Sequence, residues 1–233
     1  HGLFVHMDGA RISNACAAQD VSLQEMTARA GLDVLSLGGT KNGLLGAEAV
    51  IFFRPELALG FKYLRKQGMQ LASKMRFLAV QMEALFAGDL WLENARQANN
   101  MARLLKDELG RTAGVESTRE VQTNMVYCII PPQAIEKIRE HYLFYVFDPK
   151  RSEVRLVTNY DTSEEDVLGF TEVVRQALDE SSYETRFGQQ EENHRHQLWW
   201  LEGPDRFSPA SKVRGFEVSR TFGQPGGTNW TWR

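Results

Sequence analysis

The chain has 233 residues, of which 42% are hydrophobic and 24% charged, proportions typical of a soluble globular protein. This length fits one large domain or one and a half ordinary ones. The formal net charge of −3 gives no electrostatic reason to expect nucleic acid or an anionic membrane as a partner. No apolar run approaches the roughly 20 residues that span a bilayer, and no targeting segment is visible. We therefore expect a cytoplasmic protein.

The two cysteines, Cys16 and Cys128, are far apart and match no metal-ligand spacing. Free cysteines are among the most often buried residues, and they stay reduced inside the cell. We therefore expect two buried thiols and no metal site.

The first third of the chain alternates between short apolar runs and helical patterns. Ser22 followed by Glu25 has the spacing of a capping box at a helix start. The predicted elements are a strand over 3–7, a small-residue helix over 9–18, a helix from 22, and strands over 34–37 and 47–53. Apolar strands separated by helices favour a parallel or mixed α/β sheet.

The rest of the chain begins with two amphipathic helices, predicted over 71–85 and 91–109 from apolar residues at alternating steps of four and three. Shorter elements follow. They are strands over 123–130, 143–147 and 154–157, a helix over 133–141, and a last helix that Thr162 and Glu165 open as a second capping box. This change of rhythm indicates a smaller α+β domain.

We therefore divide the chain into three parts: 1–88, 89–181 and 182–233. The first is the α/β domain and the second the smaller α+β domain. The third is polar, rich in glycine, proline and arginine, and without a sustained period, so we predict an irregular tail.

Two motifs, HMDGAR at 6–11 and SLGGTKNG at 36–43, each follow an apolar run that is predicted to be a strand. The first places Asp8, and the second Lys41, just beyond its strand. An acid and a lysine at the ends of neighbouring strands are what a pyridoxal phosphate (PLP) enzyme needs. The lysine holds the cofactor aldehyde as a Schiff base, and the acid keeps the pyridine nitrogen protonated.

Each of these residues also has an ordinary interpretation. Lys41 could be a surface lysine in a glycine-rich turn, and Asp8 could cap the following helix. Thr40, beside the lysine, could donate to a phosphate, and glycines there would let the backbone approach a flat ring. His6 shares a strand face with Asp8, so it is a candidate cofactor neighbour or a packed histidine.

Two arginines complete the candidate site. Arg11 could reach the cofactor ring or the substrate. Arg155 lies inside an otherwise apolar strand, where arginine is costly to bury unless paired. A guanidinium binds a carboxylate through two hydrogen bonds, which suits an amino-acid substrate. The alternative for Arg155 is an edge-strand arginine that points to solvent.

Taken together, the motifs resemble those of the low-specificity L-threonine aldolases, within the aromatic amino-acid β-eliminating lyase/threonine aldolase family. The resemblance covers about residues 1–180 and is carried by 6–15, 36–43 with 47–50, 73–77, and 154–158 with Asp161. It implies the aspartate aminotransferase-like, PLP-dependent fold (fold type I), as a homodimer or homotetramer. It also implies a retro-aldol cleavage of β-hydroxy amino acids to glycine and an aldehyde, which is acetaldehyde when threonine is the substrate.

By this resemblance, Lys41 is the Schiff-base lysine and Asp8 the partner of the pyridine nitrogen. Arg11 contacts the cofactor or the substrate carboxylate, and Arg155 binds that carboxylate. In the family, an upstream segment supplies the phosphate loop and a histidine stacked on the ring. We find neither here, so we expect the chain to begin inside its active-site domain and to be nearly inactive alone.

Two other functions remain open from the sequence. One is a different PLP enzyme of fold type I, such as a β-eliminating lyase or an aminotransferase. The other is a non-catalytic, truncated subunit that retains dimerising surfaces.

Overall fold

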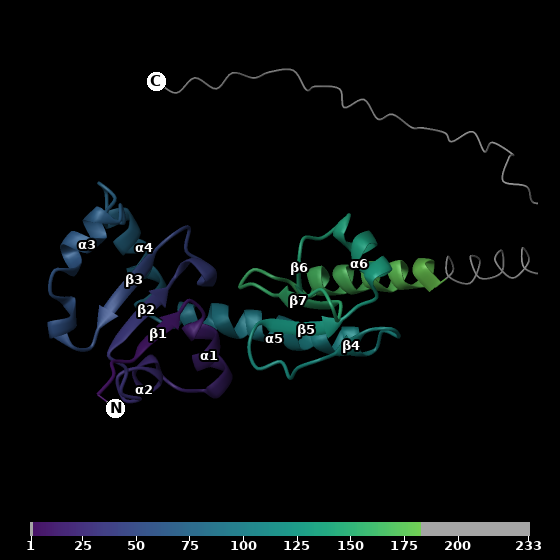
Figure 1. The fold of residues 1–233 in the computed structure, drawn as a ribbon, viewed down its shortest axis with the longest axis horizontal. Helices are drawn as coiled ribbons and strands as arrows, with labels where there is room; N and C mark the ends of the chain where they lie inside the picture. Colours follow the sequence, from purple (N-terminus) through teal and green to yellow (C-terminus); the bar gives the residue numbers. More distant parts are fainter. Residues whose placement is uncertain (1, 183–233) are drawn as a thin grey trace, which may run out of the picture. The chain divides into compact units, whose positions relative to one another are not determined.

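In the computed structural model, residues 2–182 are described, and they form two β-sheets with their associated helices (Figure 1). All of them belong to one compact unit. The predicted irregular tail over 182–233 lies, apart from its first residue, outside the described residues.

The first sheet contains three strands in the order β1-β2-β3, with bounds His6–Gly9, Val34–Gly38 and Glu48–Phe52. Strands β1 and β2 run parallel, and Asp8 is the register partner of Ser36. Strand β3 runs antiparallel to β2. The sheet is therefore mixed, one of the two arrangements that the apolar runs predict.

Short helices follow the strands of this sheet. They are α1 (Ile12–Gln19), α2 (Leu23–Met26), the 3₁₀ turns η1 (Thr40–Asn42) and η2 (Pro55–Ala58), α3 (Phe61–Gln67) and α4 (Arg76–Phe86). The capping box of Ser22 and Glu25 is confirmed at the start of α2. Side chains of α1 and β2 form the core here, among them Ile12, Cys16, Leu35 and Leu37.

The long helix α5 (Leu90–Gly110) leads to the second sheet and packs against α1. This antiparallel sheet has the order β4-β5-β7-β6, with bounds Glu116–Ser117, Met125–Ile129, Glu153–Val157 and Tyr145–Asp148. Helix α6 (Pro132–Arg139) and a helix over 164–182 accompany it. A second core joins these elements, with Leu105, Leu109, Val126, Ile138 and Val174 among its buried residues.

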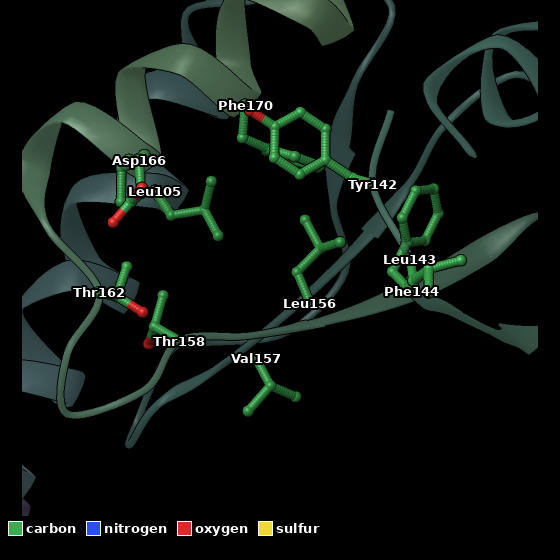
Figure 2. A pocket seen from close by; sticks show the side chains of 11 residues that line it. Leu105, Tyr142, Leu143, Phe144, Leu156, Val157, Thr158, Thr162, Asp166 and Phe170 are labelled. Atoms are coloured by element: carbon green, nitrogen blue, oxygen red, sulfur yellow. The ribbon is translucent and has the colours of Figure 1, made fainter. Parts of the chain in front are cut away.

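A cavity of about 180 Å³ opens between α5, β7, the loop before β6 and the helix over 164–182 (Figure 2). Apolar side chains line most of it, including Leu105, Leu156 and Phe170. Two of its polar lining residues are already engaged, since Thr158 Oγ1 donates to the Ala98 carbonyl and the Ser163 N–H donates to Asp166 Oδ2. None of the predicted site residues lines this cavity.

Two predicted element starts are wrong, and one helix was not predicted. Strand β1 begins at His6 rather than at residue 3, and Leu3 and Phe4 are exposed. The helix predicted over 71–85 begins only at Arg76, and α3, which was not predicted, precedes it. Apolar spacing alone does not mark where helical backbone begins, and the N-cap of α4 makes no side-chain hydrogen bond that would have signalled it.

The second predicted capping box is shifted by one residue. Ser163 and Asp166 form it: the Ser163 N–H and hydroxyl donate to Asp166 Oδ2, and the Asp166 N–H donates to Ser163 Oγ. Thr162 Oγ1 instead accepts from the Asn159 N–H in the preceding turn. Thr162 and Ser163 are adjacent, and each has an acidic residue three positions later. The sequence alone therefore could not decide which of the two residues caps the helix.

Both cysteines are buried and free, as predicted. Within residues 2–182, no helix is long and apolar enough to cross a membrane, and no group of His, Cys, Asp and Glu side chains could hold a metal ion.

Candidate active site

The parallel pair β1 and β2 brings the two sequence motifs to one edge of the first sheet (Figure 1). Asp8 lies on β1 beside Ser36 of β2, and Lys41 lies in η1, just beyond the end of β2. The two segments touch, because a Cβ added at Gly38 would lie 2.7 Å from the Ala10 Cα. An acid near the end of β1 and a lysine just beyond the end of β2 therefore lie at the carboxyl ends of two adjacent parallel strands.

Asp8 is exposed, and its Oδ1 accepts a hydrogen bond of 3.0 Å from the Ala10 N–H. It does not cap the helix, because the N-cap of α1 is Arg11 and makes no side-chain cap bond. His6 is also exposed, and its Nε2 lies 2.9 Å from Ser36 Oγ. In strand β1, alternate residues share a face, so His6 and Asp8 lie on the same side of the sheet.

Lys41 is exposed on its 3₁₀ turn, and no hydrogen bond or ion pair of its side chain is found within residues 2–182. Thr40 beside it is exposed as well, and its N–H donates to Glu48 Oε1 at 3.3 Å. The turn is tightly built, since a Cβ at Gly39 would lie 2.8 Å from the Ala47 carbonyl oxygen. The structure thus presents an available amine on a constrained backbone.

Arg11 and Arg155 have the same unusual property. Each is half-buried, and the Nε atom of each is buried without a hydrogen-bond partner within residues 2–182. A buried polar group without a partner costs about 1–3 kcal/mol. An anionic oxygen from a cofactor or a substrate would remove that cost, and the anion-binding roles of both arginines stay predictions.

Arg155 does not lie on an edge strand, so the alternative of an edge arginine pointing to solvent is wrong. Strand β7 is internal, and Arg155 has Tyr127 of β5 and Tyr145 of β6 as register partners. Its guanidinium carbon lies 5.3 Å from the Tyr145 ring centroid, a cation–π contact. The neighbours Val154 and Leu156 face the core, so Arg155 faces away from it.

Sequence reasoning missed a set of asparagines that join these segments to helix α5. Asn14, in the first turn of α1, exchanges two hydrogen bonds with the buried Asn99 of α5. Asn42, just after Lys41, bonds to Trp91 and Asn94 of the same helix. The available signal was an asparagine next to Ala98 and Ala102 on the predicted apolar face of α5, since a buried amide needs a partner.

Comparison with known proteins assigns the family. The sequence profile of the beta-eliminating lyase family matches residues 1–130, more than half of the chain. The chain belongs to the beta-eliminating lyase family. The chain is 42% identical over 175 residues to the low specificity L-threonine aldolase of Pseudomonas aeruginosa, an alignment that covers 75% of the chain and 50% of that relative. The chain thus spans about half the length of its relative.

Two solved structures extend the comparison. A threonine aldolase of Leishmania major is 28% identical and superposes with a TM-score of 0.68, over 76% of this chain and 52% of that one. The structure of Oryza sativa TDC with PLP and tryptamine is 13% identical, with a TM-score of 0.57 over 77% and 45% of the two chains. The second likeness concerns the fold alone. The chain therefore has the PLP-dependent fold of type I, as predicted.

Proposed function

We propose that the whole protein is a PLP-dependent aldolase that cleaves L-threonine and L-allo-threonine to glycine and acetaldehyde. The observation that carries this proposal is that Asp8 lies on β1 and Lys41 lies in the turn just beyond β2, at the carboxyl ends of two adjacent parallel strands. The unpartnered Nε atoms of Arg11 and Arg155 supply sites for anions. Similarity to the Pseudomonas aeruginosa L-threonine aldolase favours threonine as the substrate.

In this proposal, the Lys41 amine holds the cofactor aldehyde and the Asp8 carboxylate holds a proton on the pyridine nitrogen. When bound, PLP supplies the electron sink for the pair left at the substrate Cα. Asp8 suits its role because only its Oδ1 is engaged, by the Ala10 N–H, within residues 2–182. Thr40 and His6 flank the two reactive groups and are proposed cofactor contacts.

Arg155 is proposed to bind the substrate carboxylate, and Arg11 either that carboxylate or the cofactor. A planar guanidinium fixes a carboxylate through two parallel hydrogen bonds, which orients the amino acid as well as binding it. Stacking of Arg155 on Tyr145 restricts its guanidinium before substrate arrives. The arginine then contributes to specificity for amino acids over free alcohols.

The activity belongs to the whole protein, and we propose that the 233-residue chain alone turns over slowly. The side chains of Asp8 and Lys41 are exposed, so water has free access to both. Exclusion of water strengthens the electrostatic interactions on which the chemistry depends. We further propose a homodimer or homotetramer in the cytoplasm, a compartment that keeps the two free cysteines reduced.

Product analysis tests the proposed reaction. The whole protein is loaded with PLP and incubated separately with L-threonine, L-allo-threonine and L-serine, and glycine and aldehyde are measured. From each of the two threonine isomers we expect one molecule of acetaldehyde for every molecule of glycine. The Lys41→Ala variant should release neither product. Release of ammonia and 2-oxobutanoate from threonine without glycine would instead assign β-elimination, the second reaction that the family name suggests.

A further inference from the structure

The residue that follows Lys41 is held at two points by a single turn of helix α5. The Asn42 side-chain Nδ2 donates to the Trp91 carbonyl at 2.8 Å. The Asn42 backbone carbonyl in turn accepts from Asn94 Nδ2 at 2.9 Å. Asn42 is only 4% exposed, so these bonds are shielded from competition with water.

The backbone on both sides of the lysine is built around this contact. Gly43 has a φ of +109°, and a Cβ there would lie 2.9 Å from Asn94 Nδ2. On the other side, the Asn42 N–H donates to the Gly39 carbonyl at 3.0 Å. The turn is therefore closed on itself and bonded to α5, while the Lys41 side chain is left exposed.

A lysine that must form a bond to a bound aldehyde benefits from such a support. Its side chain has several rotatable bonds, and each ordered rotamer costs entropy. Fixing the backbone in advance lowers the cost of bringing the amine to one place. Asn94 does this from a helix that is far from Lys41 in the sequence.

We propose that Asn42 and Asn94 form an amide clasp that fixes the Lys41 turn on α5, so that the lysine amine meets the PLP aldehyde in one orientation. The inference rests on the proposed function, since it takes Lys41 as the residue that holds the cofactor. Asn42 and Asn94 are positioning residues, because they act through the backbone that carries Lys41.

The test uses the whole protein loaded with PLP and three variants: Asn94→Asp, Asn94→Ser and Asn99→Ser. Asn94→Asp keeps the shape but removes the donor to the Asn42 carbonyl. Asn99→Ser is the matched control, because Asn99 also donates to a backbone carbonyl, that of Asn14, from the same helix at 2.9 Å. The readouts are the visible circular dichroism per mole of bound cofactor, the rate of borohydride-trapped labelling at Lys41, and the melting temperature.

We expect both Asn94 variants to lose at least half of the visible circular dichroism per bound cofactor. We also expect Lys41 labelling to slow about tenfold, the equivalent of one hydrogen bond of about 1.4 kcal/mol. Asn99→Ser should lower the melting temperature but keep the wild-type dichroism. Wild-type dichroism in both Asn94 variants, or an equal loss in Asn99→Ser, would overturn the clasp. A wild-type protein that gives no visible band would instead overturn the proposed function, and the clasp with it.

Discussion

At the scale of single residues, Arg11 and Arg155 each bury a polar Nε atom in a way that does not stabilise the fold. Arg155 occupies an internal strand, yet its buried Nε has no hydrogen-bond partner within residues 2–182. Arg11 has the same deficiency at the start of α1. A fold does not gain from a buried donor without an acceptor. We therefore propose that both arginines bind anions.

Replacing Arg155 with lysine tests this attribution. Lysine keeps the charge but cannot form the two parallel hydrogen bonds of a guanidinium. We expect KM for L-threonine to rise about tenfold or more, with a smaller change in kcat, because about 1.5–3 kcal/mol of charge-assisted bonding is lost. Steady-state kinetics of the whole protein provide both constants.

The control for this prediction is Arg151→Lys, since Arg151 is an exposed residue in the turn before β7. That variant should retain the wild-type KM. If Arg155→Lys left KM unchanged as well, Arg155 would not bind the substrate carboxylate.

At this scale, candidate site residues could be predicted from the sequence only where a local motif marks them. The side chains of Asp8 and Lys41 could be nominated, because each follows an apolar run that can be recognised locally. The contact between Asn42 and Asn94 could not, because it joins positions 52 residues apart and neither asparagine belongs to a periodic pattern. The roles of Asp8 and Lys41 as site residues stay predictions.

At the scale of elements, the helix over 164–182 depends on the capping box of Ser163 and Asp166. Hydrogen bonds from Ser163 also lower the pKa of the Asp166 carboxyl below its usual value. Ser163→Ala should lower the free energy of unfolding by about 1 kcal/mol, the usual cost of losing an N-cap hydroxyl. Urea denaturation measures this change directly.

Glu165→Ala is the informative comparison, because Glu165 belongs to the capping box that the sequence predicts and the structure does not contain. We expect this variant to unfold at the wild-type urea concentration. If Glu165→Ala destabilised the protein and Ser163→Ala did not, the capping box would be formed by Thr162 and Glu165, as the sequence predicts.

The elements that the sequence predicts correctly are those with strong periodicity or a complete apolar run. Helix α5 and strands β2, β3, β5 and β7 all lie within one or two residues of their expected bounds. Helix α3 was missed because its residues Phe61–Gln67 mix aromatic and basic side chains, and none of them is buried. An element stabilised by few core contacts leaves little pattern in the sequence.

At the scale of the whole molecule, we expect the buried thiol of Cys128 to make stability depend on pH above about pH 9. Burial raises the pKa of Cys128 to about 12, and the nearby Glu153 carboxylate contributes in the same direction. In the unfolded chain this thiol ionises near pH 9. Its contribution to stability is therefore complete below pH 9 and is lost progressively as the pH rises from 9 towards 12.

The stability difference between wild type and Cys128→Ala should shrink by about 1.4 kcal/mol per pH unit above pH 9, the value for one proton. Urea denaturation of both proteins at pH 8, 9, 10 and 10.5 measures this dependence. A difference that stays constant over this range would mean that the thiol ionises equally in the folded and unfolded states.

The central claim for the molecule is that the parallel strands β1 and β2 deliver Asp8 and Lys41 to one cofactor. Borohydride reduction of the PLP-loaded whole protein, followed by peptide mapping, tests it most directly. We predict a single pyridoxyl label on Lys41, with its rate of formation reduced in Asp8→Asn. A label on another lysine, or none under conditions that saturate a PLP enzyme, would contradict the account.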